Sequence, residues 1–165
     1  MYAWFVERLV RRNFGDFNRG DASGVLARFT DDVHFRFGGE HALAIDSRSK
    51  TDVERWFARV FELLPGVRFE IDEVVVAGPP WNLRFCTRYT VRAAGAGDGL
   101  VYRALQIARV RWGRVVEDLI YPDTQAVAAY LGALGAAPNA PASKSRPADA
   151  AASRATASAS SPRSG

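Results

Sequence analysis

Apolar residues at helical spacing predict three main helices and one short helix. In residues 3–18 the apolar positions that share one helical face are Phe5, Leu9, Val10, Phe14 and Phe17. The clearest pattern covers residues 51–64, where apolar residues recur every three or four positions. A short helix is expected over residues 21–29, and a last helix is expected after Asp123, whose side chain can cap it.

Alternating apolar and polar residues predict strands in the rest of the domain. A first strand is expected over residues 33–37. Four longer strands are expected over residues 67–77, 81–93, 101–112 and 115–121. Helices gathered on one side of such a sheet make an α+β domain. We therefore predict a cone-shaped, curved, mixed or antiparallel sheet, with helices packed across its concave face and a pocket between the two layers.

The composition changes sharply near the end of the chain. Residues 136–165 contain 11 Ala, 7 Ser and 4 Pro, and they contain no Ile, Leu, Val or aromatic residue. Such a segment cannot bury enough apolar surface to offset the entropy lost on ordering. We therefore predict a folded domain over residues 1–135 and a disordered Ala/Ser/Pro-rich tail over residues 136–165. The tail holds three of the four net positive charges, so the domain is nearly neutral, which argues against a nucleic-acid partner.

Several classes of protein are excluded by what the sequence lacks. A single cysteine, Cys86, rules out a disulfide framework, and no Cys/His cluster has the spacing of a zinc site. The apolar runs are too short to cross a bilayer, and Glu7 and Arg8 interrupt the stretch that a signal peptide would keep apolar. No motif implies a metal, nucleotide or flavin. We expect a cytoplasmic protein with no cofactor and with no membrane or nucleic-acid partner.

Short stretches of the chain resemble the nuclear transport factor two-like superfamily. These stretches are NRGD at 18–21, FTDDV at 29–33 and WF at 56–57. The closing runs WGRVVE at 112–117 and YPDT at 121–124 resemble its SnoaL-like, polyketide cyclase-like branch. The resemblance covers residues 3–134 and implies the α+β cone. The superfamily includes polyketide cyclases, ketosteroid isomerases, epoxide hydrolases, dehydratases and proteins without known catalysis, so the resemblance implies no single activity.

The known catalytic residues of this superfamily can be compared with this chain by position. Alignment through residues 18–21 places Asn13, Phe37 and Ala108 where ketosteroid isomerases carry a tyrosine and two aspartates. Ile120 stands where limonene-type epoxide hydrolases carry an acid, and the aspartate of SnoaL-type cyclases falls near the same place. The resemblance therefore supports neither the ketosteroid isomerase nor the epoxide hydrolase chemistry, and it gives the cyclase chemistry little support.

The apolar faces of the two long strands over 81–93 and 101–112 are expected to point into the cavity. We predict that the residues in contact with a ligand are Tyr89, Gln106, Tyr102, Asn13, Phe37, Phe57 and Trp81. A cavity with aromatic walls and a few polar points suits a small apolar or aromatic molecule. Plain packing of the core explains the same aromatic residues equally well.

Asp118 is the predicted catalytic residue, and Glu117 is the alternative. A shift of one residue at the turn containing Gly113 decides which of the two faces the cavity. The resemblance favours Asp118, whereas a simple two-residue hairpin favours Glu117. Burial would raise the pKa of the inward carboxyl group and allow it to act as a general acid or base. The structural alternative is an outward carboxylate paired with Arg109.

The outer face of the sheet is expected to carry arginines around an apolar centre. The arginines are Arg84, Arg88, Arg92, Arg103, Arg109 and Arg111, and the apolar centre consists of Leu105, Ile107 and Cys86. This pattern suggests a homodimer interface, and the alternative is a solvated face with cross-strand ion pairs. His34 should also face outward, and His41 lies in a loop, so a surface or hydrogen-bonding role is expected for both.

Two functions follow from these observations. The first is a small-molecule isomerase, cyclase or hydrolase that acts on an apolar substrate by acid–base catalysis, with Asp118 as the proton-transfer group and Tyr89 and Gln106 orienting the substrate. The second is a non-catalytic ligand-binding or dimeric scaffold module. The side chains that point into the cavity distinguish the two functions.

Overall fold

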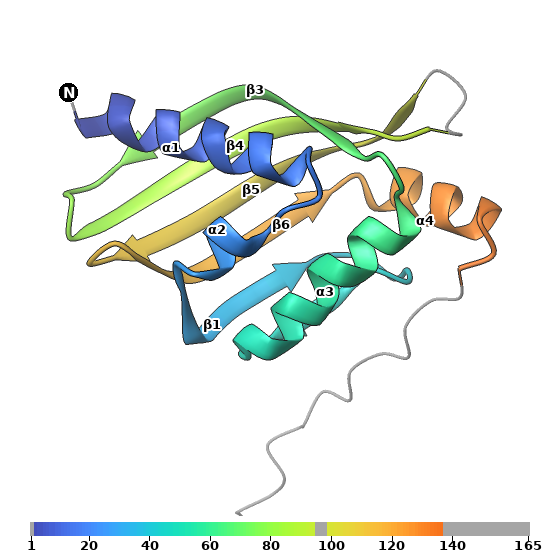
Figure 1. Cartoon of the computed structure of the whole chain (residues 1–165), viewed down its shortest axis with the longest axis horizontal. Helices are drawn as coiled ribbons and strands as arrows, with labels where there is room; N and C mark the ends of the chain where they lie inside the picture. Colours follow the sequence, from blue (N-terminus) through green and yellow to red (C-terminus); the bar gives the residue numbers. More distant parts are fainter. Residues whose placement is uncertain (1, 95–98, 137–165) are drawn as a thin grey trace, which may run out of the picture.

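The structure is a computed structural model that describes residues 2–94 and 99–136 (Figure 1). The elements within these residues are α1 (Tyr2–Phe17), α2 (Ser23–Leu26), β1 (Phe29–Phe37), β2 (Ile45–Ser47), α3 (Lys50–Leu63), β3 (Arg68–Ala77), β4 (Asn82–Arg92), β5 (Leu100–Arg111), β6 (Arg114–Pro122) and α4 (Thr124–Ala133). The predicted tail lies outside the described residues from residue 137 onward.

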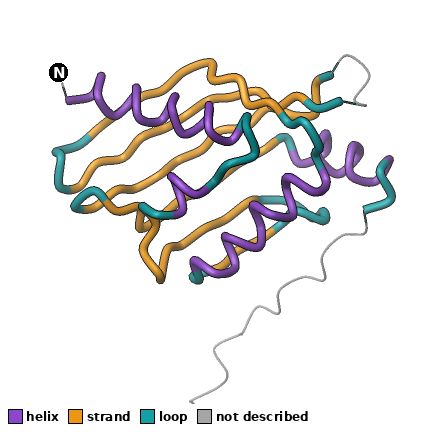
Figure 2. The backbone as a smooth tube through the Cα atoms, viewed as in Figure 1, coloured by secondary structure: helices purple, strands orange, loops and turns teal. Residues whose placement is uncertain are grey.

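The strands form a single mixed sheet in the order β2-β1-β6-β5-β4-β3. Strands β1 and β6 are parallel, and the other neighbouring strands of the described chain are antiparallel. Helices α1, α2 and α3 lie on one side of the sheet, and α4 lies at one end (Figure 2). This arrangement confirms the predicted α+β cone, whose sheet remains open.

Aromatic side chains join the two long helices to the concave face of the sheet. Phe14 of α1 meets Tyr89 of β4 with a ring-centroid distance of 5.1 Å, and Trp56 of α3 meets Phe35 of β1 at 4.9 Å. Phe17 and Phe57 stack between the helices at 5.1 Å. Burial of each such side chain stabilises the fold by about 1.5–3 kcal/mol. Contacts between large aromatic rings therefore hold the helices over the sheet.

Two elements differ from the sequence prediction. Helix α2 ends at Leu26, and β1 begins at Phe29, four residues earlier than expected. Phe29 is only 1% exposed and pairs with Val115 of β6, so long-range sheet pairing overrides the local helical pattern. The short edge strand β2 was not predicted, because three residues carry too little alternation to be recognised.

Candidate functional site

A cavity of about 180 Å³ lies between the sheet and the helices. Its walls come from α1, β1, α3 and strands β3 to β6, and most of the lining side chains are apolar or aromatic. The polar side chains that reach it deep in the cone are Asn13, Tyr89, Tyr102, Gln106 and Asp118. The space is therefore an apolar chamber with a small polar region on one wall.

The position of Asp118 depends on an irregularity in the β5–β6 hairpin. Near the turn, Val110 pairs with Val115, but further along Arg109 pairs with Glu117. One extra residue, Val116, therefore stands in β6 as a β-bulge. If Val116 instead paired regularly with Arg109, Glu117 would face inward. Because of the bulge, Asp118 faces the cavity and Glu117 faces the opposite side of the sheet.

Asp118 is held by Gln106 from the neighbouring strand. The Nε2 atom of Gln106 donates to Oδ1 of Asp118 at 2.8 Å and to Oδ2 at 2.9 Å. Asp118 is only 4% exposed. Burial raises the pKa of its carboxyl group to about 7, and the hydrogen bonds from Gln106 oppose that rise. The carboxyl group can therefore hold or release a proton near neutral pH.

Gln106 itself retains an unused acceptor. Its Oε1 atom is buried and has no hydrogen-bond partner within the described part of the chain. A buried carbonyl oxygen without a partner costs about 1–3 kcal/mol. The polar region of the cavity therefore offers an acceptor next to Asp118 that a ligand donor can satisfy.

Tyr89 and Tyr102 supply the neighbouring hydroxyl groups. Burial raises the pKa of Tyr102 above its usual range. Burial also raises the pKa of Tyr89 well above that range, and the charges of Tyr102 and Asp118 add to the rise. Both phenols therefore stay protonated at neutral pH and can donate hydrogen bonds to a bound molecule.

Most of the predicted ligand contacts lie in the cavity wall. Asn13, Phe57, Tyr89, Tyr102 and Gln106 all line it. Helix α1 contributes more of the wall than expected, although its apolar stripe was visible in the sequence. The additional lining residues of α1 are Tyr2, Phe5, Val6, Leu9, Val10, Phe14 and Phe17.

Two of the predicted contact residues do not line this cavity. Trp81 precedes β4, lies in a turn and is 54% exposed, so it is not part of the wall. Phe37 is buried, but its ring packs against Trp56, Tyr102 and His41 rather than against the cavity. The strand alternation placed both residues on the inner face, but it did not show where the strand starts or where the cavity ends.

The alternatives for the carboxylates and the histidines are also resolved. Asp118 is not paired with Arg109, whose Nε atom donates to Asn82 instead at 3.1 Å. Glu117 lies on the outer face, 3.8 Å from Nδ1 of His34. His41 is buried, and its Nε2 atom contacts the carbonyl oxygen of Gly38 at 3.1 Å. Burial lowers the pKa of His41, which favours its neutral form.

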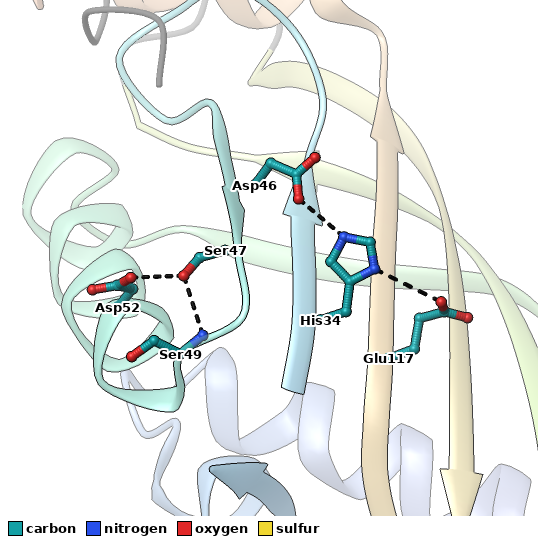
Figure 3. Close-up of polar contacts among 6 residues, drawn as sticks. All are labelled: His34, Asp46, Ser47, Ser49, Asp52 and Glu117. Carbon is teal, nitrogen blue, oxygen red and sulfur yellow. Dashed lines mark hydrogen bonds and ion pairs between the residues drawn. The ribbon is translucent and has the colours of Figure 1, made fainter. Parts of the chain in front are cut away.

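The outward histidine belongs to a polar group that spans β1, β2 and β6 (Figure 3). The Nε2 atom of His34 lies 2.9 Å from Oδ1 of Asp46 in β2, so the histidine bridges β2 and β6 across β1. Nearby, Ser47 donates to Asp52 at 2.6 Å and accepts from the backbone nitrogen of Ser49 at 3.2 Å (Figure 3). These contacts fix the edge strand and the start of α3.

A mixed open sheet with helices over its concave face and a cavity between the layers is the α+β cone of the nuclear transport factor two-like superfamily. Residues 10–118 match the family model of the SnoaL-like domain. The chain therefore belongs to the SnoaL-like domain family. No curated protein is detectably similar to it in sequence.

Solved structures of the same fold superpose on most of the chain. An NTF2-like protein from Burkholderia thailandensis has a TM-score of 0.57 and 20% identity, over 75% of this chain and 95% of that one. A candidate polyketide cyclase from Sinorhizobium meliloti has a TM-score of 0.54 and 16% identity, over 69% and 94%. A candidate isomerase from Rhodopseudomonas palustris has a TM-score of 0.56 and 17% identity, over 79% and 96%. These similarities concern the fold alone.

Residues 2–94 and 99–136 contain neither a membrane-spanning helix nor a metal-binding cluster. No helix there is both long enough and apolar enough to span a membrane. No group of three or more His, Cys, Asp or Glu side chains is arranged there to hold a metal ion.

Proposed function

We propose that this protein is a small-molecule enzyme that binds an apolar or aromatic substrate in the cavity and transfers a proton through Asp118. The observation that carries this proposal is the buried carboxyl group of Asp118, which lines the cavity and has a pKa raised to about 7. A general acid or base works best when its pKa lies near the working pH. The reaction class is an isomerisation, cyclisation or hydrolysis that needs proton transfer.

The neighbouring polar groups have complementary roles in this proposal. Gln106 holds the carboxylate in one orientation through its two short contacts. Tyr89 and Tyr102 present neutral hydroxyl groups, which can stabilise negative charge on a substrate oxygen. The apolar walls exclude water and so strengthen these interactions. The family name shared with cyclases, and the solved neighbours named as candidate cyclase and isomerase, agree with this chemistry.

A screen followed by a matched pair of variants tests the proposal. Lipophilic metabolites are screened by thermal shift, and stabilising compounds are then assayed for conversion. Asp118→Asn should lower turnover by about 10²–10⁴-fold and still bind the compound, since acid–base catalysis contributes a factor of this size. The control Glu117→Gln changes the neighbouring carboxylate on the outer face and should leave turnover unchanged. Unchanged turnover in Asp118→Asn contradicts the proposal.

The second candidate is a dimeric ligand-binding or scaffold module without catalysis. An apolar row crosses the outer face of the sheet, where Cys86 pairs with Val75 on one side and Ile107 on the other, and Ile107 pairs with Leu119. Val75 is 53% exposed. Such a row favours a homodimer through this face. Light scattering at micromolar concentration tests it: a dimer that Ile107→Arg converts to a monomer supports it, and a monomeric wild type contradicts it.

A further inference from the structure

Three of the four tryptophans lie on the surface. Trp4, Trp81 and Trp112 are 60%, 54% and 79% exposed, whereas Trp56 is buried in the core. Tryptophan is usually highly buried because its ring carries a large apolar surface. The exposure of three tryptophan rings does not stabilise the fold, so another role must account for it.

The three exposed tryptophans lie at one end of the molecule. The start of α1, the β3–β4 turn and the β5–β6 turn meet there (Figure 1). The backbone nitrogen of Trp112 donates to the carbonyl oxygen of Trp81 at 3.1 Å, which joins the two turns. The hydroxyl of Tyr2 donates to the carbonyl oxygen of Pro80 at 3.4 Å, which joins α1 to them.

The same end contains the mouth of the cavity. Tyr2 and Phe5 are 38% and 59% exposed, and both also line the cavity, as does Gly113 in the β5–β6 turn. We call the five exposed aromatic residues at this end of the molecule the aromatic rim: Tyr2, Trp4, Phe5, Trp81 and Trp112. The apolar chamber thus reaches the surface at an end of the molecule that carries several exposed aromatic side chains.

Trp112 occupies its place at a cost to the backbone. It has φ of 50°, and Gly113 after it has φ of 76°, so both central residues of the two-residue turn are left-handed. Asn and Gly are the usual residues there, because a side chain with a large Cβ substituent is strained. Trp112 is too exposed to recover this cost by packing. A strained and exposed residue at a cavity mouth points to a role in binding.

Basic residues outnumber acidic residues in the segments near the aromatic rim. Residues 2–12, 27–32 and 110–114, which lie at or near this end, carry Arg8, Arg11, Arg12, Arg28, Arg111 and Arg114, against Glu7, Asp31 and Asp32. Arg11 forms an ion pair with Glu7 at 2.9 Å, and the guanidinium of Arg8 lies over the ring of Trp4 at 5.4 Å. The excess of arginine favours an anionic partner. It disfavours a second copy joined rim to rim, because that contact brings like charges together.

We propose that the aromatic rim docks on the surface of an anionic phospholipid bilayer, with the mouth of the cavity facing the lipid. Tryptophan and tyrosine prefer the boundary between headgroups and acyl chains, and arginines bind the lipid phosphates. The sequence prediction of no membrane partner considered segments that cross a bilayer, whereas this docking needs none. An apolar ligand would then pass between the bilayer and the cavity without entering water.

Vesicle sedimentation tests the proposal. The full chain is mixed with vesicles of phosphatidylcholine alone or of phosphatidylcholine with phosphatidylglycerol. We expect binding to the anionic vesicles, weaker binding at high salt and little binding to the neutral ones. The double variant Trp81→Ser/Trp112→Ser should lower the partition coefficient by at least about tenfold. The control Tyr121→Ser, which removes an exposed aromatic ring from the opposite end of β6, should bind like the wild type.

A second variant separates the contribution of charge to vesicle binding from the contribution of the aromatic rings. Arg111→Gln keeps the aromatic rim and should weaken anionic binding about fivefold, because one arginine near a bilayer contributes about that factor. Equal sedimentation with neutral and anionic vesicles, or unchanged binding of the double variant, would overturn the proposal. A dimer in light scattering that the double variant dissociates would also overturn it, and would assign the aromatic rim to a second copy.

Discussion

The amide nitrogen of Gln106 lies almost equally far from the two carboxylate oxygens of Asp118, at 2.8 and 2.9 Å. One donor thus serves both oxygens of a buried acid. Burial acts against ionisation and the amide acts for it, and the balance leaves the pKa of Asp118 at about 7. The charge of this group is therefore sensitive to small changes in the cavity.

The first prediction concerns stability against pH. The pKa of Asp118 is higher in the folded chain than the ordinary value of 3.8. Its contribution to stability is therefore present below about pH 4 and is lost as the pH rises through about 7, by at most about 4 kcal/mol. Asp118→Asn removes this loss, so urea unfolding should show the variant more stable than the wild type at pH 8 and nearly equal at pH 4. Glu117→Gln is the control. A difference in stability between Asp118→Asn and the wild type that does not change with pH contradicts the prediction.

The second prediction concerns the amide. Gln106→Leu removes the donor that favours the ionised form of Asp118, so the pKa of the acid should rise further. A hydrogen bond to a charged group contributes about 1.5–3 kcal/mol, which corresponds to a shift of about one to two pH units. The midpoint of the pH-dependent stability loss, measured by urea unfolding, should move upward by about half that amount, because only the upper limit of the loss, set by the folded-state pKa, moves. Gln106→Glu is a useful comparison, since a second carboxylate should raise the midpoint as well. A midpoint that stays in place shows that the amide does not tune the acid.

The third prediction concerns Thr87, which pairs with Gln106 across the sheet. Thr87 is completely buried, and its hydroxyl oxygen has no hydrogen-bond partner among the described residues. Thr87→Val replaces this hydroxyl with a methyl group of the same shape, and it should stabilise the fold by about 1 kcal/mol. Thermal unfolding measures the change. Thr87→Ser keeps the hydroxyl, loses a methyl group and should destabilise the fold. A destabilised valine variant would indicate a buried water on the hydroxyl.

The fourth prediction concerns the turn at Trp112. Trp112→Asn places a residue that tolerates positive φ where the chain is strained, so the fold should gain about 1 kcal/mol. The same variant should bind anionic vesicles more weakly than the wild type. Thermal unfolding and sedimentation of one preparation measure both quantities. A variant that is less stable than the wild type would show that contacts of the Trp112 ring stabilise the fold by more than the strain in the turn costs.

The fifth prediction concerns the end of the chain. Deletion of residues 138–165 removes a segment without Ile, Leu, Val or aromatic side chains. Such a segment has little to bury, so the melting temperature should be unchanged. Differential scanning calorimetry compares the two chains. A large drop would show that the segment docks on the domain.

Much of the fold was predictable because its elements carry strong local patterns. The stripe of α3 and the alternation of β4 and β5 are long enough to be recognised, and the cap of α4 by Asp123 is confirmed by its contact with the nitrogen of Ala126 at 3.1 Å. Strand β2 was missed because it is short and is held by its partner β1. Local sequence therefore predicts elements well where they are long and poorly where pairing alone defines them.

The candidate site was predictable only in part. Alternation limited the inward acid to two neighbouring residues, Glu117 and Asp118, but the choice depends on the bulge at Val116. Val115 and Val116 are both apolar, so the sequence does not show which one continues the regular pairing. Trp81 was placed in the cavity because a tryptophan just before a strand cannot be told by its residue type from a buried tryptophan inside the strand. In both cases the backbone decided which way the side chain faces: a bulge did so for Asp118, and the start of β4 did so for Trp81.

The extra residue in β6 has a consequence for how such proteins diverge. Loss of Val116 by a single-codon deletion would remove the bulge and restore regular pairing, with Glu117 still opposite Arg109 and Asp118 still opposite Ala108, so the chamber wall would keep its aspartate. Relatives that lose this one residue can therefore keep the same acid at the wall, whereas a relative that keeps it and pairs it regularly with Arg109 would present the glutamate instead.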